Sequence, residues 1–243
     1  RLLEEPRIRF DGISGSSAGA INAVAFASGF LAGGRTAARD SLERLWRTVS
    51  EQATFGPLQE TPVDQWLHGW NRDWSPGFLM MNNLTRVASP YQFNPAGFNP
   101  LIQILEDTVD FARIRHDSRL RLFVSATRVR TASARIFRRD ELSARVVAAS
   151  ACLPVLFQAI QIDGEHYWDG GYTANPALWP LLQECRARDL ILVQLIPPER
   201  TELPTTSGAI RERADEIAFH AHLNRELELL GMLHQGRGGW RWN

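Results

Sequence analysis

The sequence predicts an α/β protein built in layers, and three observations lead to this class. Strand-like runs alternate along the chain with helix-like runs, as layered α/β folds require. The 243 residues are enough to bury one sizeable core. A glycine-rich turn joins the first predicted strand directly to the first predicted helix. We expect a single domain over residues 1–243, interrupted by an insertion over residues 51–100.

The first elements follow from local patterns. Residues 7–14 alternate like a strand and stop at a glycine. Residues 17–30 are small and apolar and predict a helix that ends at Gly29 or at Gly33–Gly34. Residues 35–50 predict a second helix, which is amphipathic.

The character of the chain changes over residues 51–100. Prolines interrupt this stretch at positions 57, 62, 76, 90, 95 and 100, and tryptophans and phenylalanines make it strongly aromatic. We expect short helices and loops that form a lid-like insertion in the main fold.

The middle of the chain predicts a helix, two strands and a further helix. Residues 101–109 are helical in pattern, and residues 120–129 form an apolar run typical of a buried strand. Residues 134–139 are the expected partner of that strand. Residues 143–153 predict a helix that Ser143 caps.

The last third of the chain predicts a hairpin, a strand and two helices. Residues 158–171 form the hairpin, with the tight turn at Asp163–Gly164. Residues 175–185 begin a helix, residues 189–197 form a fully apolar strand, and residues 208–235 form a long amphipathic helix.

Composition excludes some function classes. Basic and acidic residues balance at 27 each, so no nucleic-acid partner is expected. Cys152 and Cys185 lie in apolar surroundings and are expected to be reduced thiols, which favours a reducing compartment. No apolar run has the length of a membrane span, and no signal peptide is visible. We therefore expect a cytoplasmic protein, and no metal or cofactor.

The segment Gly15-Ser16-Ser17-Ala18-Gly19 fits the nucleophile elbow G-x-S-x-G, with a strand before it and a helix after it. A side chain at either glycine would collide in so sharp a turn. The turn would expose the Ser17 hydroxyl at the end of the sheet, beside a helix N-terminus that favours negative charge. The alternative is a glycine- and serine-rich turn without chemistry.

A serine needs a base, and Asp169 is the leading candidate. It ends a strand-like run, and Gly170 and Gly171 follow, which frees the backbone to direct the carboxylate into a crevice. The alternative is a plain Asp-Gly turn. His166 lies on the same hairpin, and the other five histidines are in polar segments that indicate surface positions: His68, His116, His220, His222 and His234.

The stretches FDGISGSSAGAINA and YWDGGYTANP together resemble the patatin-like phospholipases, especially the bacterial branch. ASACLPVLFQAIQIDGEHYWDGGY and LFVSATRVRTASARIFRRDELS are also typical of that family. The resemblance covers about residues 5–225. It implies a three-layer α/β/α fold and lipid acyl hydrolysis by a Ser–Asp dyad without histidine. Ser17 matches the family nucleophile and Asp169 the aspartate of its D-G-G motif.

One feature of the family is missing from the chain. The glycine-rich loop D-G-G-G-x-R/K-G, which forms the oxyanion hole in the family, and the strand before it are not found. Residues 1–5 resemble the end of the helix that would follow that loop. We expect either a further segment upstream or a chain without its main oxyanion donors, in which case the amide of Ala18 could supply one donor.

Two other functions fit the same sequence. One is an α/β-hydrolase esterase with a triad of Ser17, Asp169 and His220, which occur in the required chain order. The other is a catalytically silent module that binds lipid.

The proposed substrate is a lipid or phospholipid, and the insertion offers a way to reach it. Trp66, Trp70 and Trp74 recur every four residues and would lie on one helical face. Tryptophans on one face suit peripheral contact with a membrane interface. The alternative is a core stripe that packs on the sheet.

Overall fold

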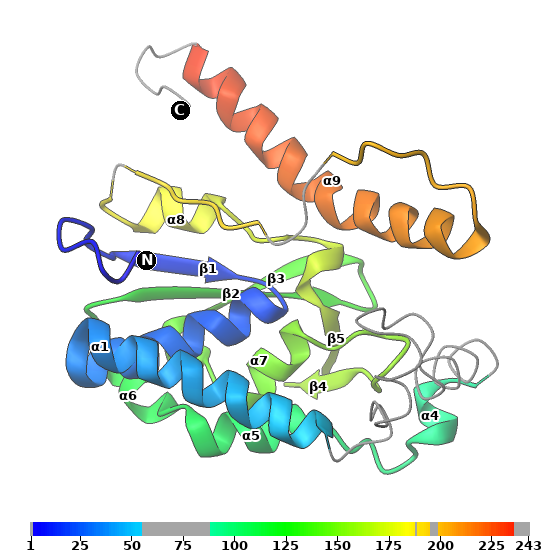
Figure 1. Cartoon of the computed structure of the whole chain (residues 1–243), viewed down its shortest axis with the longest axis horizontal. Coiled ribbons are helices and arrows are strands. Elements are labelled where there is room, and N and C mark those ends of the chain that lie inside the picture. The colour runs from blue at the N-terminus through cyan, green and yellow to red at the C-terminus, as the bar shows by residue number, and fades with distance from the viewer. Residues whose placement is uncertain (1, 55–87, 188, 195–198, 236–243) are drawn as a thin grey trace, which may run out of the picture.

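The computed structural model describes residues 2–54, 88–187, 189–194 and 199–235. A sheet lies between two helical layers (Figure 1). One layer contains α1 (Ala18–Thr54), α5 (Pro100–Thr108), α6 (Phe111–His116) and α7 (Ala144–Ser150). The other contains α8 (Trp179–Glu184) and α9 (Ser207–Gln235). The three-layer α/β/α prediction is confirmed.

One long strand organises the sheet. Its strands are β1 (Gly12–Gly15), β2 (Arg121–Arg128), β3 (Ser133–Arg138), β4 (Ile160–Ile162) and β5 (Glu165–Asp169). Strand β2 is parallel to β1 and antiparallel to β3 and β5, and β4 pairs with β5.

The register of β2 brings β1 and β5 together end to end. Strand β3 pairs along residues 123–128 of β2 and therefore occupies one whole edge. Both β1 and β5 must use the other edge, where Gly15 lies opposite Val124 and Asp169 lies opposite Ala126. Two residues of a strand span about 7 Å. The end of β1 and the end of β5 therefore meet on one edge of the sheet.

The continuous apolar run in β2 is explained by burial on both faces. Leu122, Val124 and Ala126 belong to the main core beside α1 and α7, whereas Phe123 belongs to a smaller core on the other face. Helix α1 packs closely on the sheet because its buried face consists largely of small residues. These include Ala20, Ala23, Val24 and Ala27.

Most predicted elements are present with shifted ends. The two helices expected over residues 17–50 form α1, which is kinked at Gly33–Gly34, where Gly34 has a φ of 73°. The hairpin turns at Asp163 and Gly164, with φ values of 48° and 81°. Helix α7 begins after its cap Ser143, whose hydroxyl accepts a hydrogen bond from the Val146 amide at 3.3 Å. It ends at Ser150 and not at residue 153.

Several boundaries were wrong. The first strand begins at Gly12, because Asp11 turns its carboxylate to Arg121 and to the amides of residues 186 and 187. Residues 2–4 form a turn and not the end of a helix. The helix expected over residues 175–185 begins only at Trp179.

Residues 189–194 form no strand, although an apolar strand was predicted over 189–197. Ile191 and Val193 are 55% and 70% exposed. An apolar segment forms a strand only where the edge strand of a sheet pairs with its backbone. None of the described strands pairs with residues 189–194.

Helix α9 covers the predicted range but is not amphipathic. Leu223 is buried against the molecule, whereas Ile210, Ile217 and Leu229 are exposed. Its apolar side chains therefore do not gather on one face.

The insertion falls largely outside the described residues. Its end forms α4 (Pro90–Phe93), which begins with a proline in its first turn. Trp66, Trp70 and Trp74 lie outside the described part of the chain, so their role in lipid contact stays a prediction.

Candidate active site

Ser17 lies in a strained turn between β1 and α1. Its φ is 54°, in the left-handed region that few residues other than glycine adopt. Such a conformation costs about 1–3 kcal/mol and is most common at functional sites. The side chain is half-buried, at the N-terminus of α1. Ser17 therefore lies at a positive φ in the short turn that joins β1 to α1.

The two elbow glycines have different roles. A Cβ on Gly15 would lie 2.4 Å from the Gly19 carbonyl oxygen, so no side chain fits there. A Cβ on Gly19 would meet no described atom within 4 Å. The expected collision is correct for Gly15 and wrong for Gly19, because Gly19 faces outward from the first turn of the helix.

Hydrogen bonds to buried hydroxyls fix the turn that carries Ser17. The Ser16 hydroxyl bonds the Ser125 hydroxyl of β2 and donates to the Ala174 carbonyl. The Ser17 amide donates to Ser150 Oγ at the end of α7, at 3.0 Å. The turn is thus tied to β2, to α7 and to the loop after β5.

Asp169 is fully buried at the end of β5. Its amide donates to the Cys152 carbonyl at 2.8 Å, and its carbonyl accepts from Thr127 Oγ1 at 2.7 Å. Its Oδ1 accepts from the Gly171 amide at 2.7 Å. Backbone and side chain are therefore both fixed.

The Ser17 hydroxyl and the Asp169 carboxylate are neighbours. Burial raises the pKa of Asp169 above that of an ordinary carboxyl, while the nearby Ser17 hydroxyl and the Gly171 amide lower it by a smaller amount. The approach of Ser17 falls short of a complete hydrogen bond, because Oδ2 is buried and has no partner among the described residues. Catalytic hydrogen bonds are often long before substrate binds. One oxygen of the carboxylate therefore has the capacity to accept a further hydrogen bond.

The two glycines after Asp169 are required because neighbouring residues leave no room for a side chain at either position. A Cβ on Gly170 would lie 2.1 Å from the Ser125 carbonyl oxygen. A Cβ on Gly171 would lie 2.3 Å from the ring of Phe219. Neither glycine has a positive φ, and the backbone after Asp169 curls into a short 3-10 helix over Gly170–Tyr172. The turn requires glycine because β2 and α9 press on it from both sides.

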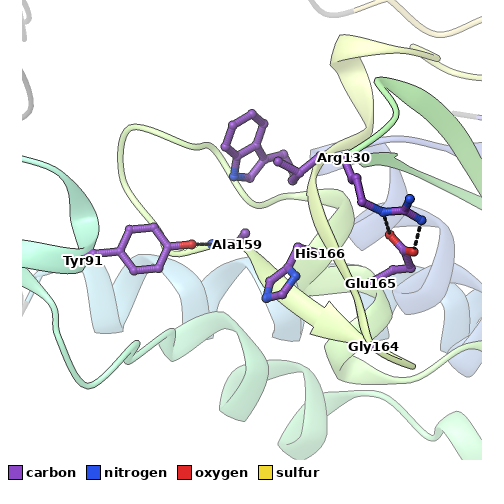
Figure 2. Close-up of a pocket in the computed structure, with 8 residues that line it drawn as sticks. Tyr91, Arg130, Ala159, Gly164, Glu165 and His166 are labelled. Carbon is purple, nitrogen blue, oxygen red and sulfur yellow. Dashed lines mark hydrogen bonds and ion pairs between the residues drawn. The ribbon is translucent and has the colours of Figure 1, made fainter.

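His166 lies away from this site. Along β5, Tyr167 and Asp169 face one side, so His166 and Trp168 face the other. His166 lines a cavity of about 240 Å³, and neither Ser17 nor Asp169 is among the residues that line it. Figure 2 shows His166 with other residues of this lining. Tyr91 reaches the Ala159 amide across this cavity. His166 is therefore not a base for Ser17.

His220 lies in α9, and its Nδ1 donates to the Glu216 carbonyl one turn earlier, at 2.8 Å. The described partners of Asp169 include no histidine. The Nδ1 atom of His220 therefore bonds within its own helix, and not to Ser17 or to Asp169.

Sequence reasoning missed Ser150, Ser125 and Thr127. All three have buried hydroxyls that form hydrogen bonds with the segments around Ser17 and Asp169. A polar residue inside an otherwise apolar strand or helix was the available signal, since a buried hydroxyl needs a partner.

We expect Ser150→Ala to weaken the site. The Ser17 amide loses its acceptor, which costs about 1–3 kcal/mol when a buried donor is left unpaired. The strained elbow should loosen, and ester hydrolysis should slow by about tenfold or more. Thermal unfolding and initial rates measure the two effects. Ser118→Ala, at an exposed position, is the control. An unchanged rate would show that the bond has no role in positioning Ser17.

Among the described residues, no group of three or more histidine, cysteine or acidic side chains is arranged to hold a metal ion. None of the described helices is both long enough and apolar enough to cross a membrane.

No curated protein matches the chain. The model of the patatin-like phospholipase family matches residues 1–182 of the 243, a range that contains both Ser17 and Asp169. Membership of this family supports activity as a lipid hydrolase. The chain therefore belongs to the patatin-like phospholipase family.

Proposed function

We propose that the chain is a lipid acyl hydrolase in which Ser17 is the nucleophile and Asp169 the base. The observation that carries the proposal is the position of a buried carboxylate, with one unpartnered oxygen and a raised pKa, beside a serine in a strained elbow. A raised pKa brings a carboxylate closer to the range where it accepts a proton efficiently.

The reaction follows in two steps. Ser17 Oγ attacks the ester carbonyl of the lipid, and its proton passes to Asp169. The tetrahedral intermediate collapses to an acyl-enzyme, and Asp169 returns the proton to the departing alcohol. Water then attacks the acyl group and gives one proton to Asp169. As the bond between the acyl carbon and Ser17 Oγ breaks, Asp169 passes this proton to Oγ, which releases the fatty acid and restores the Ser17 hydroxyl and the Asp169 carboxylate.

The first turn of α1 supplies a candidate oxyanion donor. The amides of Gly19 and Ala20 donate to the Ser16 carbonyl. Ala18 begins the helix, so its amide has no acceptor within it. A donor of this kind is worth about 100- to 1,000-fold in rate. We propose that the Ala18 amide bonds the oxyanion.

Covalent labelling tests the proposal directly. A fluorophosphonate should modify the full chain once, at Ser17, as peptide mass spectrometry would record. Ser17→Ala should abolish the labelling. A folded chain with an unreactive Ser17 would favour the alternative, a module that binds lipid without turnover.

We expect His220→Gln to leave the rate within about twofold, because a dyad needs no imidazole. In an esterase triad the same change removes the base, and loss of such a residue costs about 10,000-fold or more. Steady-state hydrolysis of a p-nitrophenyl fatty-acid ester distinguishes the two. A large loss in a variant with normal thermal unfolding would establish the triad.

We also propose that the insertion contributes lipid contact through Trp66, Trp70 and Trp74. Support for this comes from their spacing in the sequence and from the lipid substrate that the family implies.

A further inference from the structure

The C-terminal helix α9 contacts the turn that carries the candidate base. The family match ends at residue 182, whereas α9 begins at Ser207. Phe219 of α9 presses on Gly171, where even a single Cβ would come within 2.3 Å of its ring. The ring also packs on Tyr172, with 4.8 Å between the ring centroids. This contact joins a helix outside the matched region to the Asp-Gly-Gly turn.

Hydrogen bonds attach α9 to the segment that follows the turn. Asn175 Nδ2 donates to the Phe219 carbonyl at 3.3 Å. About two turns further along α9, Glu226 Oε1 accepts from the amides of Leu178 and Trp179 at the start of α8, the first at 2.9 Å. Unpaired amides at a helix start favour an acidic partner. The position of Phe219 is therefore fixed by contacts on both sides.

The turn lies between two surfaces. On one side Gly170 is in close contact with the backbone of Ser125 in β2, and on the other Gly171 is in close contact with Phe219. The amide of Gly171 is the group that bonds Asp169 Oδ1. A shift of Gly171 would therefore move the hydrogen bond that sets the direction of the carboxylate.

We propose that α9 is a positioning element of the active site, in which Phe219 holds the Gly170–Tyr172 turn against β2 and so directs the Asp169 carboxylate toward Ser17. Phe219 is a positioning residue and touches no substrate atom in this account. The catalytic consequence rests on the function proposed above, whereas the mechanical contact does not.

Kinetics of Phe219 variants of the full chain test the catalytic part. Phe219→Ala should lower kcat for p-nitrophenyl ester hydrolysis by about 10- to 100-fold, as expected for a displaced catalytic group, with KM nearly unchanged. Phe219→Leu, which keeps an apolar side chain against Gly171, should recover most of the rate. Ile217→Ala, at an exposed position of the same helix, should match the wild type. An unchanged kcat in Phe219→Ala would overturn the proposal.

A double-mutant cycle separates positioning from a general loss of stability. Gly171→Ala alone should lower kcat, because its Cβ collides with the Phe219 ring. In Gly171→Ala/Phe219→Ala the collision with the ring is absent, and only the approach of the new Cβ to Asp169 Oδ1, at 3.1 Å, remains. The fold-loss in kcat of the double variant should therefore be smaller than the product of the two single fold-losses. Residues in contact show such coupling, whereas independent ones do not. Losses that multiply fully would overturn the proposal.

Hydrogen exchange tests the contact without turnover. In a Ser17→Ala background, Phe219→Ala should speed exchange of the amides in residues 170–173, and Ile217→Ala should not. Exchange that stays unchanged would overturn the proposal even if Ser17 is shown to be the nucleophile. If Ser17→Ala retains full activity, the proposed function fails instead, and the exchange result still decides whether α9 holds the turn.

Discussion

Ser17→Ala should reduce the rate of hydrolysis of a p-nitrophenyl fatty-acid ester by about 10,000-fold or more. The rate that remains should be only what substrate binding and oxyanion stabilisation add to the uncatalysed reaction. Only the hydroxyl group is removed, and the Ser17 amide keeps its hydrogen bond to Ser150 Oγ. Asp169 Oδ2 has no hydrogen-bond partner among the described residues even in the wild type, so the fold should tolerate the loss. The loss should therefore be in kcat and not in thermal stability.

Ser17→Gly is the matched control for this result. The wild-type residue has a φ of 54°, which glycine adopts without strain but alanine does not. The glycine variant should be as inactive as the alanine variant and more stable than it. Loss of activity in a variant whose backbone is relaxed cannot be attributed to a distorted elbow. A rate near that of wild type in either variant would show that Ser17 is not the nucleophile.

The sequence was informative where function depends on a local pattern. The strand, turn and helix around Ser17 follow from glycine spacing and small residues, and the hairpin turn follows from Asp163–Gly164. Both site residues could therefore be selected from short motifs. The motifs alone do not predict that these residues are close to each other, which only the family resemblance implied. Their proximity depends on β1 and β5 sharing one edge of β2, a strand more than 100 residues from Ser17.

Contacts between distant segments were the hardest to predict. Ser150 bonds the Ser17 amide across 133 positions, and Phe219 reaches Gly171 from a helix that looks like any charged surface helix. Residues 189–194 show the opposite error, since apolar character alone does not supply a neighbouring edge. Local patterns give the candidate groups, and tertiary packing determines which of them meet.

Asp169→Asn should abolish activity and at the same time stabilise the protein. The amide has the shape of the carboxylate, and its oxygen can still accept the Gly171 bond that Oδ1 accepts at 2.7 Å. It cannot take the Ser17 proton, so the rate should fall by about 10,000-fold, as for loss of a comparable catalytic residue. Ester hydrolysis and fluorophosphonate labelling measure this loss, and Asp163→Asn on the hairpin turn is the control that should keep the rate.

The gain in stability should depend on pH. Burial raises the pKa of Asp169 in the folded state, so the folded protein holds this proton more tightly than the unfolded chain. Below the ordinary carboxyl pKa of about 3.9, the difference in free energy of unfolding between the wild type and the variant does not depend on pH. As the pH rises from there to the raised pKa of the folded protein, the wild type loses stability relative to the variant. Thermal unfolding measured from about pH 4 to 8 should show the unfolding temperature of Asp169→Asn rising relative to that of the wild type. Once the buried carboxyl has ionised in the folded wild type, the difference between the two should stay constant. A difference in unfolding temperature that becomes smaller with rising pH would mean that the folded protein stabilises the charged carboxylate. The pKa of Asp169 would then be lowered, whereas the proposed proton acceptor requires a raised one.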